Sequence, residues 1–261
     1  MAKRRNSNRR HRRGGSGFLY KLLSVAVICV VIVTALTFFF RVDEIVVTGE
    51  ELYTADEIRK ATGVEIGENL FLLNRSDVAQ RIMDRLPYIE EIRINPKAPD
   101  TLFIEVRECK TPLAVVQDGF AWLVSPSGSP NGKIVDQLDA AESENYGIID
   151  GVSLLAPSVG TRMTLATEFS AQQTGLLSLM AALEEQGMME QVDAIHLGDL
   201  GTLVLEYGGR FEVLLPYDAD FSFKMKALQA ILATDKIQDN MVGTFDMRRD
   251  DGKANFIPRR Q

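Results

Sequence analysis

Residues 22–40 read LLSVAVICVVIVTALTFFF, a run of 19 side chains without one charge. An α-helix rises about 1.5 Å per residue, so this run spans roughly 28 Å as a helix, close to the ~30 Å hydrocarbon core of a bilayer. Its polar side chains are limited to Ser24, Thr34 and Thr37, too few for the polar stripe of a helix in a soluble core. The sequence therefore predicts a transmembrane helix at residues 22–40.

A cleaved signal peptide is the competing interpretation of this run. Such a peptide has a shorter apolar region followed by small residues at a cleavage site. Here the run ends Phe38-Phe39-Phe40-Arg41-Val42, with no small-x-small site. We therefore expect an uncleaved anchor.

Charge is divided unevenly between the two sides of the predicted span. Residues 1–21 hold eight Lys and Arg and no acidic residue, whereas residues 41–261 hold 21 basic and 36 acidic residues. Because short basic flanks stay on the cytoplasmic side, we expect residues 1–21 to be a cytoplasmic tail and the chain after Arg41 to lie outside. This predicts a single-pass protein of the cell membrane with its N-terminus inside.

The basic tail is also typical of an arm that binds nucleic acid. The acidic remainder would repel phosphate, however, and membrane topology together with contact to anionic lipid explains the same residues. We therefore expect the bilayer, and no nucleic acid, as a partner of the tail.

Composition and cysteine usage exclude several classes of protein. With 46% hydrophobic and 25% charged residues, the chain is neither disordered throughout nor fibrous. Cys29 lies in the predicted span and Cys109 beyond it, so the two cannot pair, and each is interpreted as a small apolar residue. The sequence has no CxxC motif or Cys/His cluster for a structural zinc ion.

The pattern in residues 42–110 is that of a small β-α-α-β-β domain. Thr54 and Glu57 form a capping box at the start of a helix, and Gly63 supplies its left-handed end. The expected elements are strands at 42–48, 88–94 and 101–108, helices at 54–63 and 74–86, a turn at 95–100, and a loop at 67–74 anchored by Leu70, Phe71 and Leu73.

Four pieces of this domain have a recognisable sequence. They are IVVTG at 45–49, GENLF at 67–71, LPYI at 86–89 and PDTLFIEV at 99–106. Together with a basic tail and one span before them, they resemble the membrane-proximal POTRA domain of the FtsQ/DivIB cell-division family. POTRA domains also occur in export and outer-membrane assembly factors, but those continue into a long β-barrel for which too little chain remains.

Residues 111–261 are expected to form a second α+β domain with antiparallel strands. A hairpin is predicted around 117–119, a loop at 125–132, and a mobile acidic stretch at 136–146. The other predicted elements are helices at 167–186 and 221–234 and strands at 133–135, 192–197, 202–207, 211–215, 244–248 and 253–257, with Gly208-Gly209 as a tight turn. This order resembles the β domain of the same family.

No catalytic or cofactor motif is present, since GxGxxG, the Walker loop, HExxH and GxSxG are all missing. His196 lies in an apolar strand and is interpreted as structural, although a membrane-anchored hydrolase centred on it stays an alternative. Acidic pairs such as Glu90-Glu91 and Glu184-Glu185 are interpreted as solvated. We expect no catalytic residue, no metal, no cofactor and no small-molecule substrate.

Binding is the remaining function, because an exposed strand edge recruits partner strands through backbone hydrogen bonds. The resemblance implies that the end of the β domain binds single-span FtsB/DivIC-like and FtsL-like proteins at the division septum, in support of septal peptidoglycan synthesis. Arg248 and Gly252 match the family pattern, Arg249 departs from it, and 253–257 is the candidate edge strand; a merely buried hairpin at 244–257 is the alternative. The candidate partner-binding residues are Arg248, Gly252, Lys253, Ala254, Asn255, Phe256 and Ile257.

Overall fold

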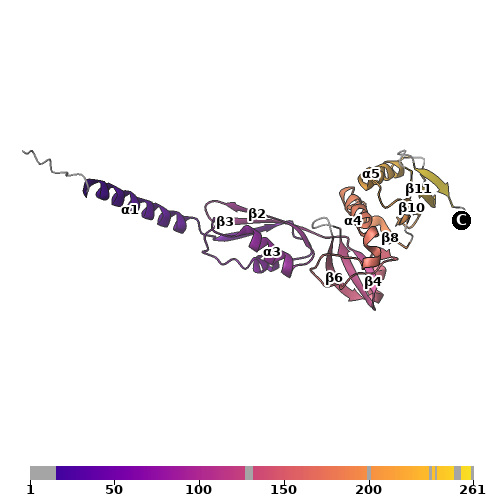
Figure 1. Cartoon of the computed structure of the whole chain (residues 1–261), viewed down its shortest axis with the longest axis horizontal. Helices are drawn as coiled ribbons and strands as arrows, with labels where there is room; N and C mark the ends of the chain where they lie inside the picture. Colours follow the sequence, from indigo (N-terminus) through magenta and orange to yellow (C-terminus); the bar gives the residue numbers. More distant parts are fainter. Residues whose placement is uncertain are drawn as a thin grey trace, which may run out of the picture.

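Three bodies follow one another along the molecule: a long helix, a small domain and a larger sheet-rich domain (Figure 1). The computed structural model describes residues 16–126, 132–198, 201–234, 237–238, 240–249 and 254–259. The C-terminal end lies at the opposite end of the molecule from the long helix.

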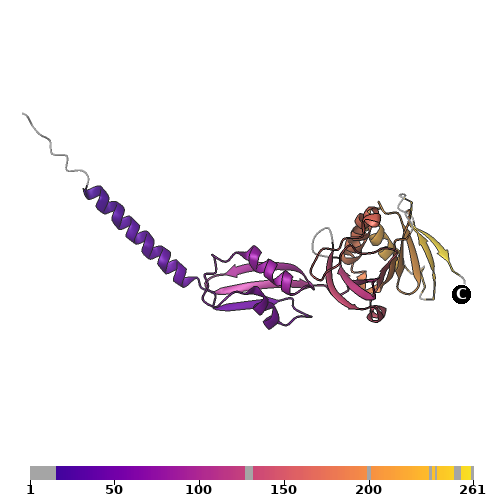
Figure 2. The ribbon, with the colours of Figure 1, turned by 60° about the horizontal axis from the view of Figure 1, so that its bottom comes forward.

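Helix α1 (Ser16–Phe39) projects from one end of the small domain (Figure 2). Its segment Tyr20–Phe39 is long and apolar enough to cross a membrane, and none of it is buried by the described parts of the chain. An apolar helix of this length is unfavourable in water when no other part of the protein covers it. Its exposure therefore agrees with the predicted membrane span.

The small domain has the predicted β-α-α-β-β order. Its elements are β1 (Glu44–Thr48), α2 (Ala55–Thr62), α3 (Arg75–Arg85), β2 (Ile89–Lys97) and β3 (Thr101–Glu108). The sheet order is β1-β3-β2, with β3 parallel to β1 and antiparallel to β2.

Local sequence signals set the helices of this domain as predicted. The Thr54 side chain accepts the Glu57 amide while the Glu57 carboxylate accepts the Thr54 amide, and Gly63 ends α2 with φ +63°. Asn74 caps α3 through the Ser76 amide. The two helices then bury one face against the sheet through Ile58, Ala61, Val78 and Ile82.

Two predictions for the small domain were wrong in detail. The turn expected at 95–100 is shorter, because Asn95, Pro96 and Lys97 continue β2 and pair with the start of β3. A proline fits there because β2 is the edge strand and loses no ladder donor. Phe71 does not anchor its loop in the core, since it is 57% exposed whereas Leu70 is 1% exposed.

The described part of the larger domain contains a nine-stranded sheet in the order β12-β11-β10-β9-β8-β7-β4-β5-β6. The strands are β4 (Leu113–Gln117), β5 (Phe120–Ser125), β6 (Lys133–Asp139), β7 (Ile148–Asp150), β8 (Val192–His196), β9 (Leu203–Tyr207), β10 (Phe211–Leu215), β11 (Gly243–Asp246) and β12 (Asn255–Pro258). The helices are α4 (Ser170–Glu185) and α5 (Phe221–Leu232), with short 3-10 turns η1 (Ala140–Asn145), η2 (Thr167–Phe169) and η3 (Met189–Gln191).

The α+β class is confirmed, but the large sheet is mixed rather than wholly antiparallel. The pairs β4–β7, β7–β8 and β10–β11 are parallel. Helix α5 explains the last pair, since it carries the chain from the end of β10 back to the start of β11, as a crossover between parallel strands requires.

The acidic stretch at 136–146 was expected to be mobile, and this was wrong. Residues 136–139 continue β6, and the Asp139 side chain accepts the Ala141 amide at the start of η1. Tyr146 is partly buried and packs against the same hydrophobic cluster as Tyr88 of the small domain.

The main core lies between the sheet and helices α4 and α5. Leu176, Leu179, Met180 and Leu183 supply the predicted stripe of α4, and all four are buried. The hairpins form where predicted, because Asp118 and Gly119, and likewise Gly208 and Gly209, take positive φ angles at the two turn positions.

Candidate functional site: the open edge of the large sheet

The predicted edge strand is an edge in the structure. β12 pairs with β11 in antiparallel register, Thr244 opposite Ile257 and Phe245 opposite Phe256. Among the described strands, β12 has a neighbour on one side only. A strand in this position offers a row of backbone groups to another chain.

The ladder pattern decides which backbone groups of β12 face outward. The Arg259 amide donates to the Val242 carbonyl at 2.8 Å, and the bonded and non-bonded pairs of an antiparallel ladder alternate. Asn255 and Ile257 therefore direct their N–H and C=O groups toward β11. Phe256 directs its N–H and C=O groups away from β11, and no described strand receives them.

Side chains on β12 divide between the two faces of the sheet. Phe256 packs on the core side, its ring centroid 4.8 Å from that of Phe245 and 6.2 Å from that of Phe211, and Ala254 packs on the same core. Ile257 faces the other way and is 56% exposed. The aromatic cluster fixes the strand, while the Ile257 side chain stays exposed to solvent.

Arg248 follows β11 and is held by Asp246. Its Nη2 atom is 2.7 Å from Asp246 Oδ2 and its Nε atom 3.0 Å from Oδ1. These hydrogen bonds lower the pKa of Asp246 to about 2, so the pair stays charged at neutral pH. Gly252 and Lys253, the other two predicted positions, lie outside the described residues.

Lys224 is a further positioning residue that the sequence analysis missed. It is buried in α5, and its ammonium donates to the Met247 carbonyl at 2.7 Å and to the Arg249 carbonyl at 3.0 Å. A signal was present, because a lysine three residues after Phe221 and four before Leu228 falls on the buried stripe of the helix. Lys224 thus fixes the segment that leaves β11.

A surface cleft of about 380 Å³ lies beside this edge on the face opposite the helices. Its lining includes Glu212, whose carboxylate accepts the Thr244 hydroxyl at 2.9 Å and a guanidinium N–H of Arg259 at 3.0 Å. These bonds link β10, β11 and the end of β12, so the cleft is continuous with the edge.

The imidazole ring of His196 lies between two carboxylates. Its Nδ1 atom is 2.7 Å from Asp150 and its Nε2 atom 3.2 Å from Glu206, so both ring nitrogens face carboxylates and neither is left to activate a hydroxyl. Burial opposes the charged ring, but the hydrogen bonds and charges of the two carboxylates outweigh it and raise the pKa of His196. Within the described ranges, no group of His, Cys, Asp and Glu could hold a metal ion.

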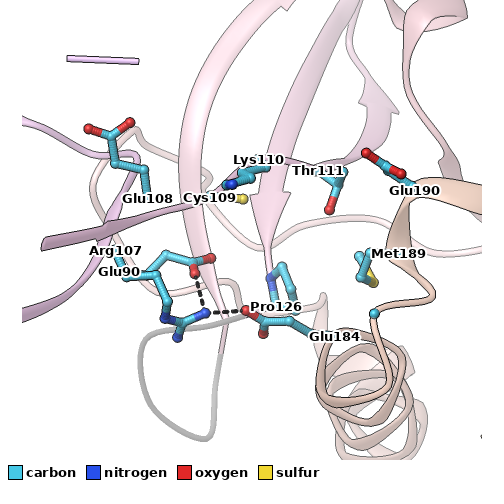
Figure 3. A pocket seen from close by; sticks show the side chains of 11 residues that line it. Glu90, Arg107, Glu108, Cys109, Lys110, Thr111, Pro126, Glu184, Met189 and Glu190 are labelled. Carbon is cyan, nitrogen blue, oxygen red and sulfur yellow. Dashed lines mark hydrogen bonds and ion pairs between the residues drawn. The ribbon is translucent and has the colours of Figure 1, made fainter. Parts of the chain in front are cut away.

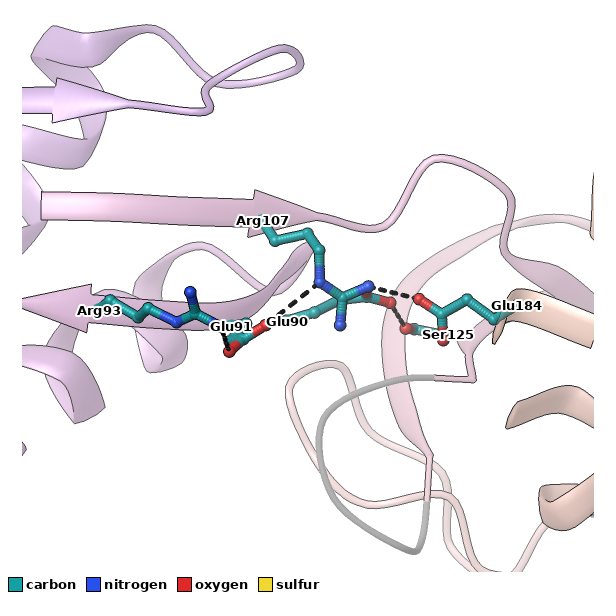
Figure 4. Close-up of polar contacts among 6 residues, drawn as sticks. All are labelled: Glu90, Glu91, Arg93, Arg107, Ser125 and Glu184. Carbon is teal, nitrogen blue, oxygen red and sulfur yellow. Dashed lines mark hydrogen bonds and ion pairs between the residues drawn. The ribbon is translucent and has the colours of Figure 1, made fainter. Parts of the chain in front are cut away.

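The junction between the two domains is a second polar centre, and here the interpretation of Glu90 as solvated was wrong. Glu90 is buried, accepts the Ser125 hydroxyl, and lies 3.1 Å from Arg107 (Figure 4). The Tyr88 hydroxyl donates to Asp136 at 2.9 Å across the same boundary, and burial and this bond raise the pKa of Tyr88.

A cavity of about 250 Å³ opens at this junction, lined by Glu90, Arg107, Cys109 and Glu184 among others (Figure 3). Burial raises the pKa of the Cys109 thiol to about 12, which disfavours the reactive thiolate, and the thiol is free. The junction carries no local sequence signal, because it joins residues that are far apart along the chain, such as Glu90, Ser125 and Glu184.

Comparison with known proteins gives one consistent result. A family model described as "POTRA domain, FtsQ-type" matches residues 40–108, and one described as "Cell division protein FtsQ/DivIB, C-terminal" matches residues 121–248. The cell division protein DivIB of Clostridium tetani is similar, with 20% identity over 84% of this chain and 80% of that protein. The cell division protein FtsQ of Syntrophotalea carbinolica is 25% identical over 80% of this chain and 71% of that protein.

Proposed function

Because the chain belongs to the FtsQ/DivIB family of cell-division proteins, we propose that it is a non-enzymatic membrane scaffold of the bacterial division machinery. In this proposal residues 1–21 lie in the cytoplasm, residues 22–40 cross the membrane, and residues 42–110 and 111–261 form two extracytoplasmic domains at the septum. The basic tail before an uncharged helix supports this orientation.

The partners proposed are single-span FtsB/DivIC-like and FtsL-like proteins, and through them septal peptidoglycan synthesis. The observation that carries this proposal is the open edge at β12, where Phe256 presents an outward N–H and C=O. A partner strand added there would extend the nine-stranded sheet by backbone hydrogen bonds, and Ile257 would supply side-chain selectivity.

Membrane tethering makes a modest edge contact sufficient. Two proteins anchored in one bilayer meet at a high effective concentration, so the strand contact itself needs only weak intrinsic affinity. The scaffold would act by holding its partners together, which agrees with His196 having both nitrogens occupied by carboxylates.

A fluorescent fusion and an affinity purification in the native bacterium test this function together. We expect the fusion at midcell, filamentous cells on depletion, and co-purification of the DivIC-like and FtsL-like proteins. Recovery of a β-barrel protein without midcell localisation would instead identify an export or outer-membrane assembly factor. Protease added outside intact cells should digest the domains after Arg41, and their protection would refute the orientation.

A further inference from the structure

The loop between α2 and α3 is fixed to the end of helix α1. We define the juxtamembrane loop as residues 64–73. The Leu70 amide donates to the Phe40 carbonyl at 2.9 Å, and the Asn69 side chain donates to the Thr37 carbonyl at 3.2 Å. Since Thr37 lies within the last turns of the apolar segment, the loop lies at the level where the helix ends.

Three large apolar side chains of this loop point away from the protein. Ile66 is 64% exposed, Phe71 57% and Leu72 79%, whereas their neighbour Leu70 is buried. Single exposed apolar residues are ordinary, but three in one short loop form an apolar patch, and such patches mark binding surfaces.

This patch is continuous with the apolar surface of the helix. The Phe71 ring contacts the Phe40 ring edge-on with centroids 5.0 Å apart, and Phe40 contacts Phe39 in the same way at 5.1 Å. The helix joins the end of the small domain that is farthest from the large domain (Figure 2). The environment that surrounds the last turn of α1 therefore also contacts the patch.

We propose that Ile66, Phe71 and Leu72 insert into the membrane leaflet in which helix α1 ends. The inference rests on the proposal that α1 crosses a membrane. Insertion would bury the three side chains at the boundary between acyl chains and headgroups, where aromatic rings are favoured. It would also hold the small domain at a fixed orientation to the bilayer, because the loop is hydrogen-bonded to Thr37 and Phe40 before Arg41 and to Val42 after it.

The charges around the patch indicate whether charge attraction or burial of apolar surface would draw the loop into lipid. Asp43, Glu44, Glu65 and Glu68 are exposed nearby, while the guanidinium of Arg41 lies over the Phe38 ring, 4.2 Å from its centroid. Acidic residues are repelled by anionic lipid, so burial of apolar surface must provide the attraction. We therefore expect insertion into zwitterionic bilayers without a need for anionic headgroups.

Tryptophan probes in the full chain test the proposal. Leu72→Trp and Ile66→Trp place a probe on the patch, and Leu52→Trp is the matched control, because Leu52 is 59% exposed on the same domain but contacts Glu108 at the end next to the large domain. The native Trp122 is buried and gives a common baseline. In phosphatidylcholine nanodiscs, we expect blue-shifted emission and strong quenching by brominated lipid for the patch probes only.

The other possible results would each contradict a different part of the proposal. A chain that enters nanodiscs but shows no bromine quenching at residues 66 and 72 would refute the insertion alone. A blue shift without bromine quenching would place the patch against a second copy or another protein, and quenching that requires phosphatidylglycerol would replace apolar insertion by charge attraction. A chain that fails to enter nanodiscs would refute the membrane span on which both proposals rest.

Discussion

Arg107 of the small domain donates a 2.5 Å hydrogen bond to Glu184 of helix α4 in the large domain. The same guanidinium lies 3.1 Å from the buried carboxylate of Glu90 and 3.5 Å from Glu91 (Figure 4). One arginine therefore neutralises carboxylates on both sides of the junction, and it holds two independently cored domains at one relative orientation.

Replacing Arg107 with alanine should loosen this junction. Glu90 would keep its Ser125 bond but lose its cation, and leaving a buried acceptor poorly satisfied costs on the order of 1–3 kcal/mol. We expect a lower urea midpoint and a broader distribution of interdomain distances in small-angle scattering. Arg93→Ala is the control, because Arg93 pairs with Glu91 at the surface and such pairs contribute below about 1 kcal/mol. Equal effects of the two variants would contradict the role given to Arg107.

Phe256→Pro should weaken partner binding more than Phe256→Ala does. Both variants remove the ring from the aromatic cluster, but only proline removes the outward N–H of β12. Leaving a partner's carbonyl without that donor costs about 1–3 kcal/mol, which is roughly a 5- to 150-fold loss of affinity. The measurement is the affinity of the full chain in nanodiscs for a purified DivIC-like protein. Indistinguishable affinities of the two variants would remove the edge-strand contact from the proposed function.

Ile257→Pro tests the backbone groups of β12 that face β11. The Ile257 amide faces β11, so proline there should break the β11–β12 ladder itself and expose the Phe256 ring. Hydrogen exchange in β11 should be faster for Ile257→Pro than for Phe256→Pro, because both variants disturb the aromatic cluster but only Ile257→Pro also removes a ladder donor. The reverse result would mean that the outward and inward assignments of the ladder are exchanged.

Lys224→Met should release the segment after β11 while leaving the small domain folded. The buried ammonium satisfies the Met247 and Arg249 carbonyls, and the thioether of methionine cannot donate to them. We expect faster hydrogen exchange in β11 and β12 and weaker partner binding. Lys226→Met removes an exposed lysine two residues away and should change neither quantity. Loss of exchange protection in the small domain would show a general effect instead of a local one.

His196 should make stability depend on pH near neutrality. The raised pKa of His196 means that the folded state binds the proton more tightly than the unfolded chain does. In the unfolded chain the pKa of a histidine is about 6.5. The stabilisation from the charged ring is therefore complete below pH 6.5 and is lost as pH rises through the raised value. Urea midpoints should fall between pH 6 and pH 8.5 more for the native chain than for His196→Gln, and parallel pH profiles would contradict the coupling to Asp150 and Glu206.

His196→Ala also separates a scaffold from a hydrolase. A structural histidine can be removed without loss of function, so the variant should restore normal division to cells depleted of the native chain. Failure to complement by a variant that folds normally and still binds its partners would restore a catalytic role for His196.

Short-range signals made most of the small domain predictable. The capping box at Thr54, the left-handed Gly63 and the alternation along β3 each depend on neighbours within a few residues, so the sequence carries them directly. The edge strand at 255–258 was predictable for a different reason, since it followed from the likeness to a family and from its place near the end of the chain.

Long-range contacts explain the features that were not predicted. Glu90 looks like half of a solvated acidic pair until Arg107 and Ser125 are brought beside it by folding. The parallel pairing of β10 with β11 depends on where helix α5 delivers the chain, which periodicity does not encode. Phe71 was expected in the core because its apolar character is visible in sequence, whereas its outward direction is set by the loop's bonds to helix α1.

The position of β12 sets a geometric condition for the membrane-anchored partner that we propose to dock there. The open edge lies at the end of the molecule opposite helix α1, with the whole length of both domains between them (Figure 1). A docking strand that followed directly after a neighbour's own membrane helix would fall short of it. The proposed partner would therefore need a stiff stalk, such as a long coiled coil, to reach from its own membrane helix past both domains to β12.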